Sequence, residues 1–145
     1  MTSPRLSRPL EVLLVEDNPA DVRLTTEVLR DAATPTRLHV ACDGEQGIEV
    51  IRELGSDRRL DLVVLDYNLP RKSGLEVLRE CKADPALRRI PVVMLSGSGD
   101  DRDVQRCYEL HANAYVTKPV EFDRFNEVIR AVERFWLGIA TLPSE

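Results

Sequence analysis

The chain has 145 residues, about the length of one domain, and its 43% hydrophobic and 31% charged residues are an ordinary balance for a protein with a buried core. The net charge of −5 argues against a nucleic-acid partner, which would require a basic patch, and no apolar run approaches the roughly 18 residues of a membrane span. The three cysteines, Cys42, Cys81 and Cys107, lack metal-like spacing, so we expect free thiols in a reducing cytoplasm.

Short apolar runs alternate with helical patterns along the chain. Residues 1–9 lack the apolar segment of a signal peptide, and we expect a flexible lead there. The predicted strands then cover residues 10–16, 37–42, 60–66, 90–97 and 114–118. The predicted helices cover residues 18–32, 43–54, 74–84, 100–112 and 121–140. The first of these helices has Asn18 as its expected N-cap and Pro19 at its first helical position.

Five strand–helix units predict an α/β domain with a parallel sheet. The strands are continuous apolar runs, as expected of a sheet that helices cover on both faces. Five strands are too few for an eight-stranded barrel, so the pattern indicates a doubly wound sheet with its site beyond the carboxyl ends of the strands. We predict one domain over residues 10–137, followed by an apolar extension over residues 138–145.

Acidic residues stand at the ends of two predicted core strands. Glu16 and Asp17 end the first strand, and Asp66 ends the third. Because the carboxyl ends of parallel strands lie along one edge, neighbouring strands would bring these carboxylates together, where each raises the pKa of the others. A hard divalent cation relieves this repulsion, and oxygen ligands of this kind suit Mg²⁺.

Two further polar residues end the remaining strands. Ser96 places a hydroxyl at the end of the fourth strand, and Lys118 places an ammonium group at the end of the fifth. Carboxylates, a metal ion, a hydroxyl and a lysine together suit a phosphoryl group, with a carboxylate as the nucleophile. A single strand-terminal aspartate is often only a turn former or a helix cap. The joint placement at four strand ends is far more specific than any one member.

These residues carry a resemblance to a known family. The segments "LLVEDNPAD", "LVVLDYNLPRKSG", "PVVMLSGS" and "YVTKP" resemble the receiver domain of two-component response regulators, over residues 11–137. The resemblance implies a flavodoxin-like receiver fold with strand order 2-1-3-4-5 and a phosphoacceptor at Asp66. It also implies Mg²⁺ bound by Asp66, by Asp17, by the backbone carbonyl of Asn68 and, through water, by Glu16.

The resemblance assigns roles at the other strand ends as well. Ser96 and Lys118 would hold the phosphoryl oxygens. Pro119 falls where the family usually has a cis peptide bond, which would aim the lysine. Tyr115 occupies the family's aromatic switch position, where the ring turns inward as Ser96 moves toward the phosphoryl group.

The C-terminal part narrows the resemblance. The segments "SGSGDDRDVQRCYELHANAYVTKPVEFDRF" and "FWLGIATLP" look like the single-domain response regulators that accompany phytochrome-type sensor kinases. This implies a sensor histidine kinase, a bacteriophytochrome, as upstream partner, and a homodimer formed through the last helix. An apolar cluster near the C-terminus independently favours a partner surface, although the tail could instead fold back on its own core. The predicted dimer contacts are Phe135, Trp136, Leu137, Ile139 and Leu142.

Three functions fit these features. The preferred one is a phosphorylation-controlled switch that is not an enzyme beyond self-phosphotransfer and slow autodephosphorylation. A phosphatase of the haloacid dehalogenase type would use a similar aspartyl-phosphate, but it has a second aspartate where this chain has Asn68. A receiver-like binding module without phosphorylation is disfavoured because Asp17, Asp66 and Lys118 are all present.

Overall fold

The computed structural model describes residues 8–143 and contains one parallel sheet. Its strands are β1 (Leu10–Val15), β2 (Thr36–Ala41), β3 (Leu62–Asp66), β4 (Val92–Ser96) and β5 (Ala114–Thr117). They are hydrogen-bonded in the order β2-β1-β3-β4-β5, and every neighbouring pair is parallel. The predicted doubly wound fold and strand order are therefore confirmed.

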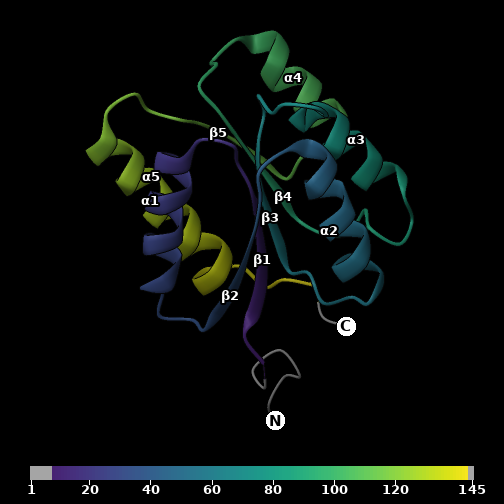
Figure 1. Ribbon diagram of the computed structural model, residues 1–145, viewed down its shortest axis with the longest axis horizontal. Coiled ribbons are helices and arrows are strands. Elements are labelled where there is room, and N and C mark those ends of the chain that lie inside the picture. The colour runs from purple at the N-terminus through teal and green to yellow at the C-terminus, as the bar shows by residue number, and fades with distance from the viewer. Residues whose placement is uncertain (1–7, 144–145) are drawn as a thin grey trace.

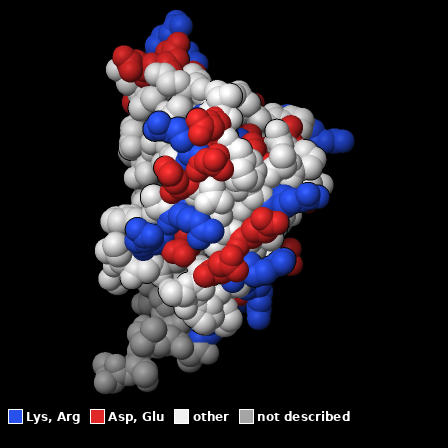
Figure 2. Space-filling view, turned by 90° about the vertical axis from the view of Figure 1, so that its left-hand side faces the viewer, with Lys and Arg blue, Asp and Glu red and all other residues white. Residues whose placement is uncertain are grey.

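Helices cover both faces of this sheet. They are α1 (Pro19–Arg30), α2 (Gly44–Ser56), α3 (Gly74–Ala83), α4 (Asp101–Glu109), α5 (Phe122–Glu133) and the π-helical turn η2 (Arg134–Ile139). Figure 1 shows α1 and α5 together on one side of the sheet and α2, α3 and α4 on the other. On the face formed by α1 and α5, acidic and basic side chains are interspersed (Figure 2). Within residues 8–143, no helix has the length and apolarity needed to cross a bilayer.

Alternation along the strands builds two apolar cores. On β1 and β3, Leu13 and Val63 point toward the helices α2, α3 and α4, whereas Leu14 and Val64 point toward α1 and α5. All four side chains are almost fully buried. A sheet that is apolar on both faces leaves only its two ends for polar chemistry.

Polar caps start four helices close behind the strands that precede them. The side chain of Asn18 accepts hydrogen bonds from two backbone N–H groups in the first turn of α1. Asp43, Ser73 and Asp100 cap α2, α3 and α4 in the same way. Each cap satisfies helix donors that would otherwise lack partners, at the point where the chain leaves the carboxyl edge of the sheet and enters a helix.

Arg8, which precedes the first strand, contacts the domain through its side chain. The guanidinium group of Arg8 donates two hydrogen bonds, of 2.9 and 3.3 Å, to the buried carboxylate of Asp61. The same carboxylate accepts the backbone N–H of Glu11 at 2.8 Å. Of the predicted flexible lead, Arg8 thus makes contact with the domain, and residues 1–7 lie outside the described part.

The C-terminal tail packs on its own domain in part. Leu137 and Leu142 are 6% and 4% exposed and belong to the core beneath α1 and α5. The hydroxyl of Thr34 donates a 3.0 Å hydrogen bond to the carbonyl of Leu137. Leu137 and Leu142, two of the predicted dimer contacts, thus pack into the core of their own chain, as in the alternative in which the tail folds back. Phe135 and Ile139 remain 49% and 68% exposed.

The tail thus has buried and exposed residues, and we predict that replacing them with alanine has unequal effects on stability. Leu137→Ala leaves a cavity in the core and should lower the free energy of unfolding by about 2–4 kcal/mol. Ile139→Ala, two residues further on, removes an exposed side chain and should change it by less than about 1 kcal/mol. Urea denaturation of both variants at low protein concentration measures the difference. Equal losses would contradict the packing of the tail described here.

Candidate functional site

Three carboxylates meet at the carboxyl edge of the sheet, as predicted. Glu16 and Asp17 follow β1, and Asp66 is the last residue of β3, the strand that pairs with β1. One carboxylate oxygen from each lies within 4.8 Å of the other two. Glu16 and Asp66 are buried, whereas Asp17 is exposed. The cluster is therefore accessible to an ion from solvent on the side of Asp17.

Lys118 joins this cluster from the far edge of the sheet. Its ammonium nitrogen lies 2.5 Å from Glu16 Oε1, 3.4 Å from Asp66 Oδ1 and 3.1 Å from Asp21 Oδ2. The sequence prediction missed Asp21. A signal was available, since Asp21 lies in the first turn of α1, directly after the capping Asn18, and so near the same edge.

The charges at this site do not balance. Burial and the neighbouring Glu16 raise the pKa of Asp66 from 3.8 to about 7, although Lys118 acts in the opposite direction. Burial lowers the pKa of Lys118, but its hydrogen bond to Glu16 and the charges of Asp66 and Glu16 outweigh this effect and raise it. One lysine thus faces several carboxylates. Their hard oxygen donors and excess negative charge fit a divalent cation such as Mg²⁺.

Ser96 and the loop after β3 complete the edge. Ser96 is fully buried at the end of β4, and its hydroxyl oxygen accepts the backbone N–H of Ser98 at 3.0 Å. Asn68, two residues beyond Asp66, is exposed. The loop returns so closely that a Cβ on Gly74 would lie 2.1 Å from the carbonyl oxygen of Asp66. Only glycine fits there, and its close approach keeps the start of α3 against the end of β3.

The predicted cis peptide bond before Pro119 is wrong, because residues 8–143 contain no cis peptide bond. The trans form of an X–Pro bond is favoured by about 0.5–1 kcal/mol. With this bond trans, the ammonium group of Lys118 contacts three acids and its backbone N–H donates to Ser96 O at 2.7 Å.

Tyr115 lies beside this edge on β5. Its ring is half-buried against the core beneath α2, α3 and α4, and its hydroxyl donates a 2.7 Å hydrogen bond to the carbonyl of Ser98. Its backbone N–H donates to the hydroxyl of Tyr108 at 3.1 Å. The predicted switch residue therefore contacts the loop that follows Ser96.

The five-stranded parallel sheet and the acidic cluster with its lysine are those of a receiver-domain class of protein, and comparison with known families agrees. The sequence profile described as "Response regulator receiver domain" matches residues 12–130. The chain belongs to this family.

Relatives with the same architecture extend over almost the whole chain. "Response regulator Rcp1" of Synechocystis sp. is 41% identical over 139 residues, which cover 94% of this chain and 95% of the relative. The crystal structure of its Mn²⁺-bound form superposes with a TM-score of 0.88, covering 94% of this chain and 100% of that one. The phosphorylated cyanobacterial phytochrome response regulator RcpA is 42% identical, with the same TM-score and the same coverage.

The raised pKa of Asp66 predicts a pH-dependent stability. Because the folded state binds this proton more tightly than the unfolded chain, the contribution of Asp66 to stability is fully present at low pH and is lost as the pH rises from 3.8 to about 7. Without metal, the free energy of unfolding of the wild type should fall relative to that of Asp66→Asn by about 3 kcal/mol between about pH 5 and about pH 8. Denaturation in a chelator at several pH values measures this, with the exposed Asp57→Asn as control. Parallel pH curves for wild type and Asp66→Asn would contradict the burial argument.

Proposed function

We propose that this protein is a phosphorylation-controlled switch in which Asp66 accepts a phosphoryl group from the phosphohistidine of a sensor histidine kinase. A carboxylate oxygen of Asp66 attacks phosphorus, the P–N bond breaks, and the imidazole nitrogen leaves with the bonding electron pair and takes up a proton. The supporting observation is the 3.4 Å contact between Asp66 and Lys118 within an acidic cluster. In this proposal Lys118 neutralises the phosphoryl oxygens and Ser96 donates a hydrogen bond to them.

We propose that the acidic cluster holds Mg²⁺. Asp17 and Asp66 would bind the ion with the backbone carbonyl of Asn68, and Glu16 would assist through water. When bound, the ion supplies positive charge that offsets the carboxylates and the incoming phosphoryl oxygens. The Mn²⁺-bound form of Rcp1, 41% identical to this chain, supports a divalent cation here.

The site favours a switch over a metabolic phosphatase. Asn68, unlike an aspartate, has no carboxyl proton to give to a leaving group. Positioning and charge neutralisation suffice for transfer from a reactive donor, and slow attack by water would later restore Asp66.

The upstream partner that we propose is a phytochrome-type sensor histidine kinase, a bacteriophytochrome, acting in the cytoplasm. Support comes from the relatives, because RcpA is described as a cyanobacterial phytochrome response regulator. The three cysteines Cys42, Cys81 and Cys107 are unpaired, as suits a reducing compartment.

We propose that the output is contact between two copies of the chain. Phe135 and Ile139 are exposed, and Trp136 packs edge-to-face on Phe135 with 5.3 Å between ring centroids. Exposed apolar side chains gathered at one helix end are typical of a partner surface. Leu137 and Leu142 would support this surface from beneath, because both are buried.

Phosphorylation can be tested on the intact protein. Incubation with Mg²⁺ and acetyl phosphate should add one phosphoryl group by intact-mass spectrometry, and Asp66→Asn should gain none. Removal of the divalent ion should slow the reaction at least about tenfold, since it removes most of the charge neutralisation. Repeated turnover of a phosphomonoester would support the phosphatase, and no adduct with any donor would support a binding module.

The dimer surface can be tested separately. Ile139→Asp should weaken self-association at least about tenfold, because it buries a charge in the proposed contact. Sedimentation with and without a phosphoryl mimic measures this and also shows whether association depends on phosphorylation. Val40→Asp alters another exposed apolar residue, on the edge strand β2, and is the control. Equal association of wild type and Ile139→Asp would exclude this surface.

A further inference from the structure

The loop between β4 and α4 is held at one residue, Ser98. A Cβ built on Gly97 or on Gly99 would meet nothing within 4 Å, so these neighbours do not fix the loop by packing. Glycines also lose more backbone freedom than other residues when they become ordered. The hydrogen bonds of Ser98 must therefore supply most of the order in this segment.

Ser98 contacts three features that matter to the site. Its backbone N–H donates to Ser96 Oγ at 3.0 Å, and its carbonyl accepts the hydroxyl of Tyr115 at 2.7 Å. Its own hydroxyl donates to Asp103 Oδ2 at 2.9 Å and accepts the backbone N–H of Asp100 at 3.1 Å. The backbone of Ser98 thus contacts Ser96 and Tyr115, and its side chain contacts the start of α4, so one residue joins all three.

Asp103 closes this network on the acceptor strand. Its second oxygen, Oδ1, accepts a 3.1 Å hydrogen bond from the hydroxyl of Tyr67, the residue directly after Asp66. Burial and this contact with Asp103 raise the pKa of the Tyr67 phenol, so its hydroxyl keeps the proton that it donates. The carboxylate of Asp103 therefore bridges the end of β3 and the loop after β4.

In this network the hydroxyl of Ser96 acts as an acceptor, and its hydrogen is not used by Ser98. A serine hydroxyl has one donor hydrogen and two acceptor lone pairs, and the Ser98 N–H occupies an acceptor position of Ser96. The one hydroxyl hydrogen of Ser96 is not used in this contact, so it can be donated to a phosphoryl oxygen. If Ser98 were released, the buried Ser96 hydroxyl would lose the N–H group that holds its oxygen.

We propose that Asp103 is a positioning residue that fixes Ser98, so that the Ser96 hydroxyl is held for donation to the phosphoryl group while Tyr67 ties α4 to the strand bearing Asp66. The inference rests on the proposed phosphorylation of Asp66. It adds Tyr67, Ser98 and Asp103 to the residues that control the reaction.

Rates of phosphorylation by acetyl phosphate test this. Asp103→Ala should lower the rate at saturating donor about fivefold, the size expected for loss of one orienting hydrogen bond, with little change in the half-saturating donor or Mg²⁺ concentrations. Tyr67→Phe should have a smaller effect in the same direction and none in the Asp103→Ala background. Ser98→Ala should lower the phosphorylation rate by about as much as Asp103→Ala. Ser98→Thr keeps the hydroxyl and should be phosphorylated at about the wild-type rate.

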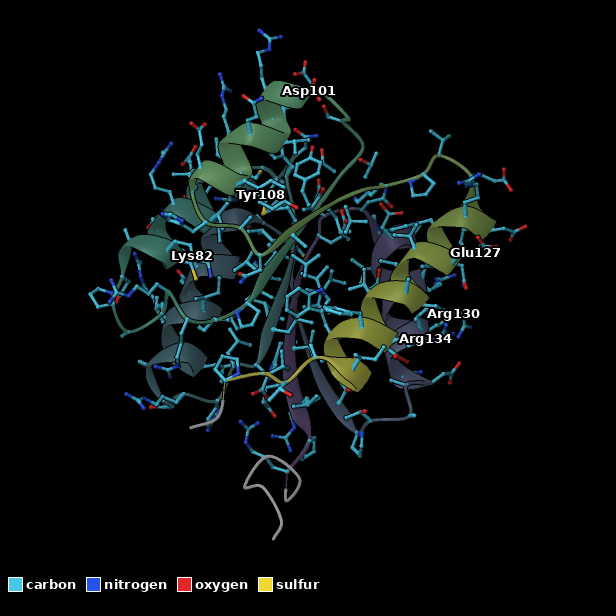
Figure 3. All side chains as sticks on the ribbon, turned by 180° about the vertical axis from the view of Figure 1, so that it is seen from behind. Lys82, Asp101, Tyr108, Glu127, Arg130 and Arg134 are labelled. Atoms are coloured by element: carbon cyan, nitrogen blue, oxygen red, sulfur yellow. The ribbon has the colours of Figure 1, made fainter. Side chains whose placement is uncertain are left out.

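The matched control is Asp101→Ala. Asp101 stands at the start of α4 (Figure 3), in the same first turn as Asp103. It is exposed, and within residues 8–143 no side-chain hydrogen bond to it is formed. The Asp101→Ala substitution removes the same charge near the helix N-terminus as Asp103→Ala, and it should leave the phosphorylation rate unchanged. Equal rates for Asp103→Ala and wild type, or equal losses for Asp103→Ala and Asp101→Ala, would overturn the proposal.

Amide hydrogen exchange in the unphosphorylated protein separates this inference from the proposed function. Exchange of the Ser98 N–H should be faster in Asp103→Ala than in wild type and Asp101→Ala. If wild type takes up no phosphoryl group, the proposed function fails, and exchange still decides whether Asp103 holds the loop. If wild type is phosphorylated but Ser98 exchange is unchanged in Asp103→Ala, only the positioning role fails.

Discussion

Two buried carboxylates that share one ammonium group set the character of this molecule. Glu16 and Asp66 lie at the ends of adjacent strands, and Lys118 approaches both. Burial makes each charge costly, and a single lysine cannot offset them together. The resulting deficit raises the pKa of Asp66 to about 7. The fold therefore holds more negative than positive charge at this site, and a bound cation would offset the excess. Because Asp17 is exposed, such an ion can reach the site from solvent.

The sheet makes this imbalance possible because its interior is apolar on both faces. The strand order places β1 beside β3, so Glu16 and Asp66 lie close together at the carboxyl ends of neighbouring strands. Beyond β3, the sheet continues with β4 and β5. The side chain of Lys118 must then extend from the outermost strand back toward β1. Asp21, in the first turn of α1, forms a further ion pair with the same ammonium group. Backbone topology thus decides which groups meet, and side-chain length decides how they pair.

This division explains what the sequence could predict. Strand-end residues such as Asp66 and Ser96 were predictable because parallel strands place their carboxyl ends on one edge. The contact of Asp21 depends on helix rotation and side-chain reach, which hydrophobic periodicity does not specify. The trans bond before Pro119 depends on tertiary contacts that can select either isomer, since the two forms differ by only about 0.5–1 kcal/mol. The burial of Leu142 depends on where the chain turns after α5.

Ser96 lies at the boundary between a rigid and a weakly held part of the chain. Behind it, β4 is fully buried and hydrogen-bonded on both sides. Ahead of it, the glycines on either side of Ser98 contribute no packing, so a few hydrogen bonds fix that segment. A negative charge added at Asp66 would not deform the sheet, because the interior of the sheet is closely packed. Any response must therefore pass into the loop and α4, where exchanging one or two hydrogen bonds changes the balance between conformations.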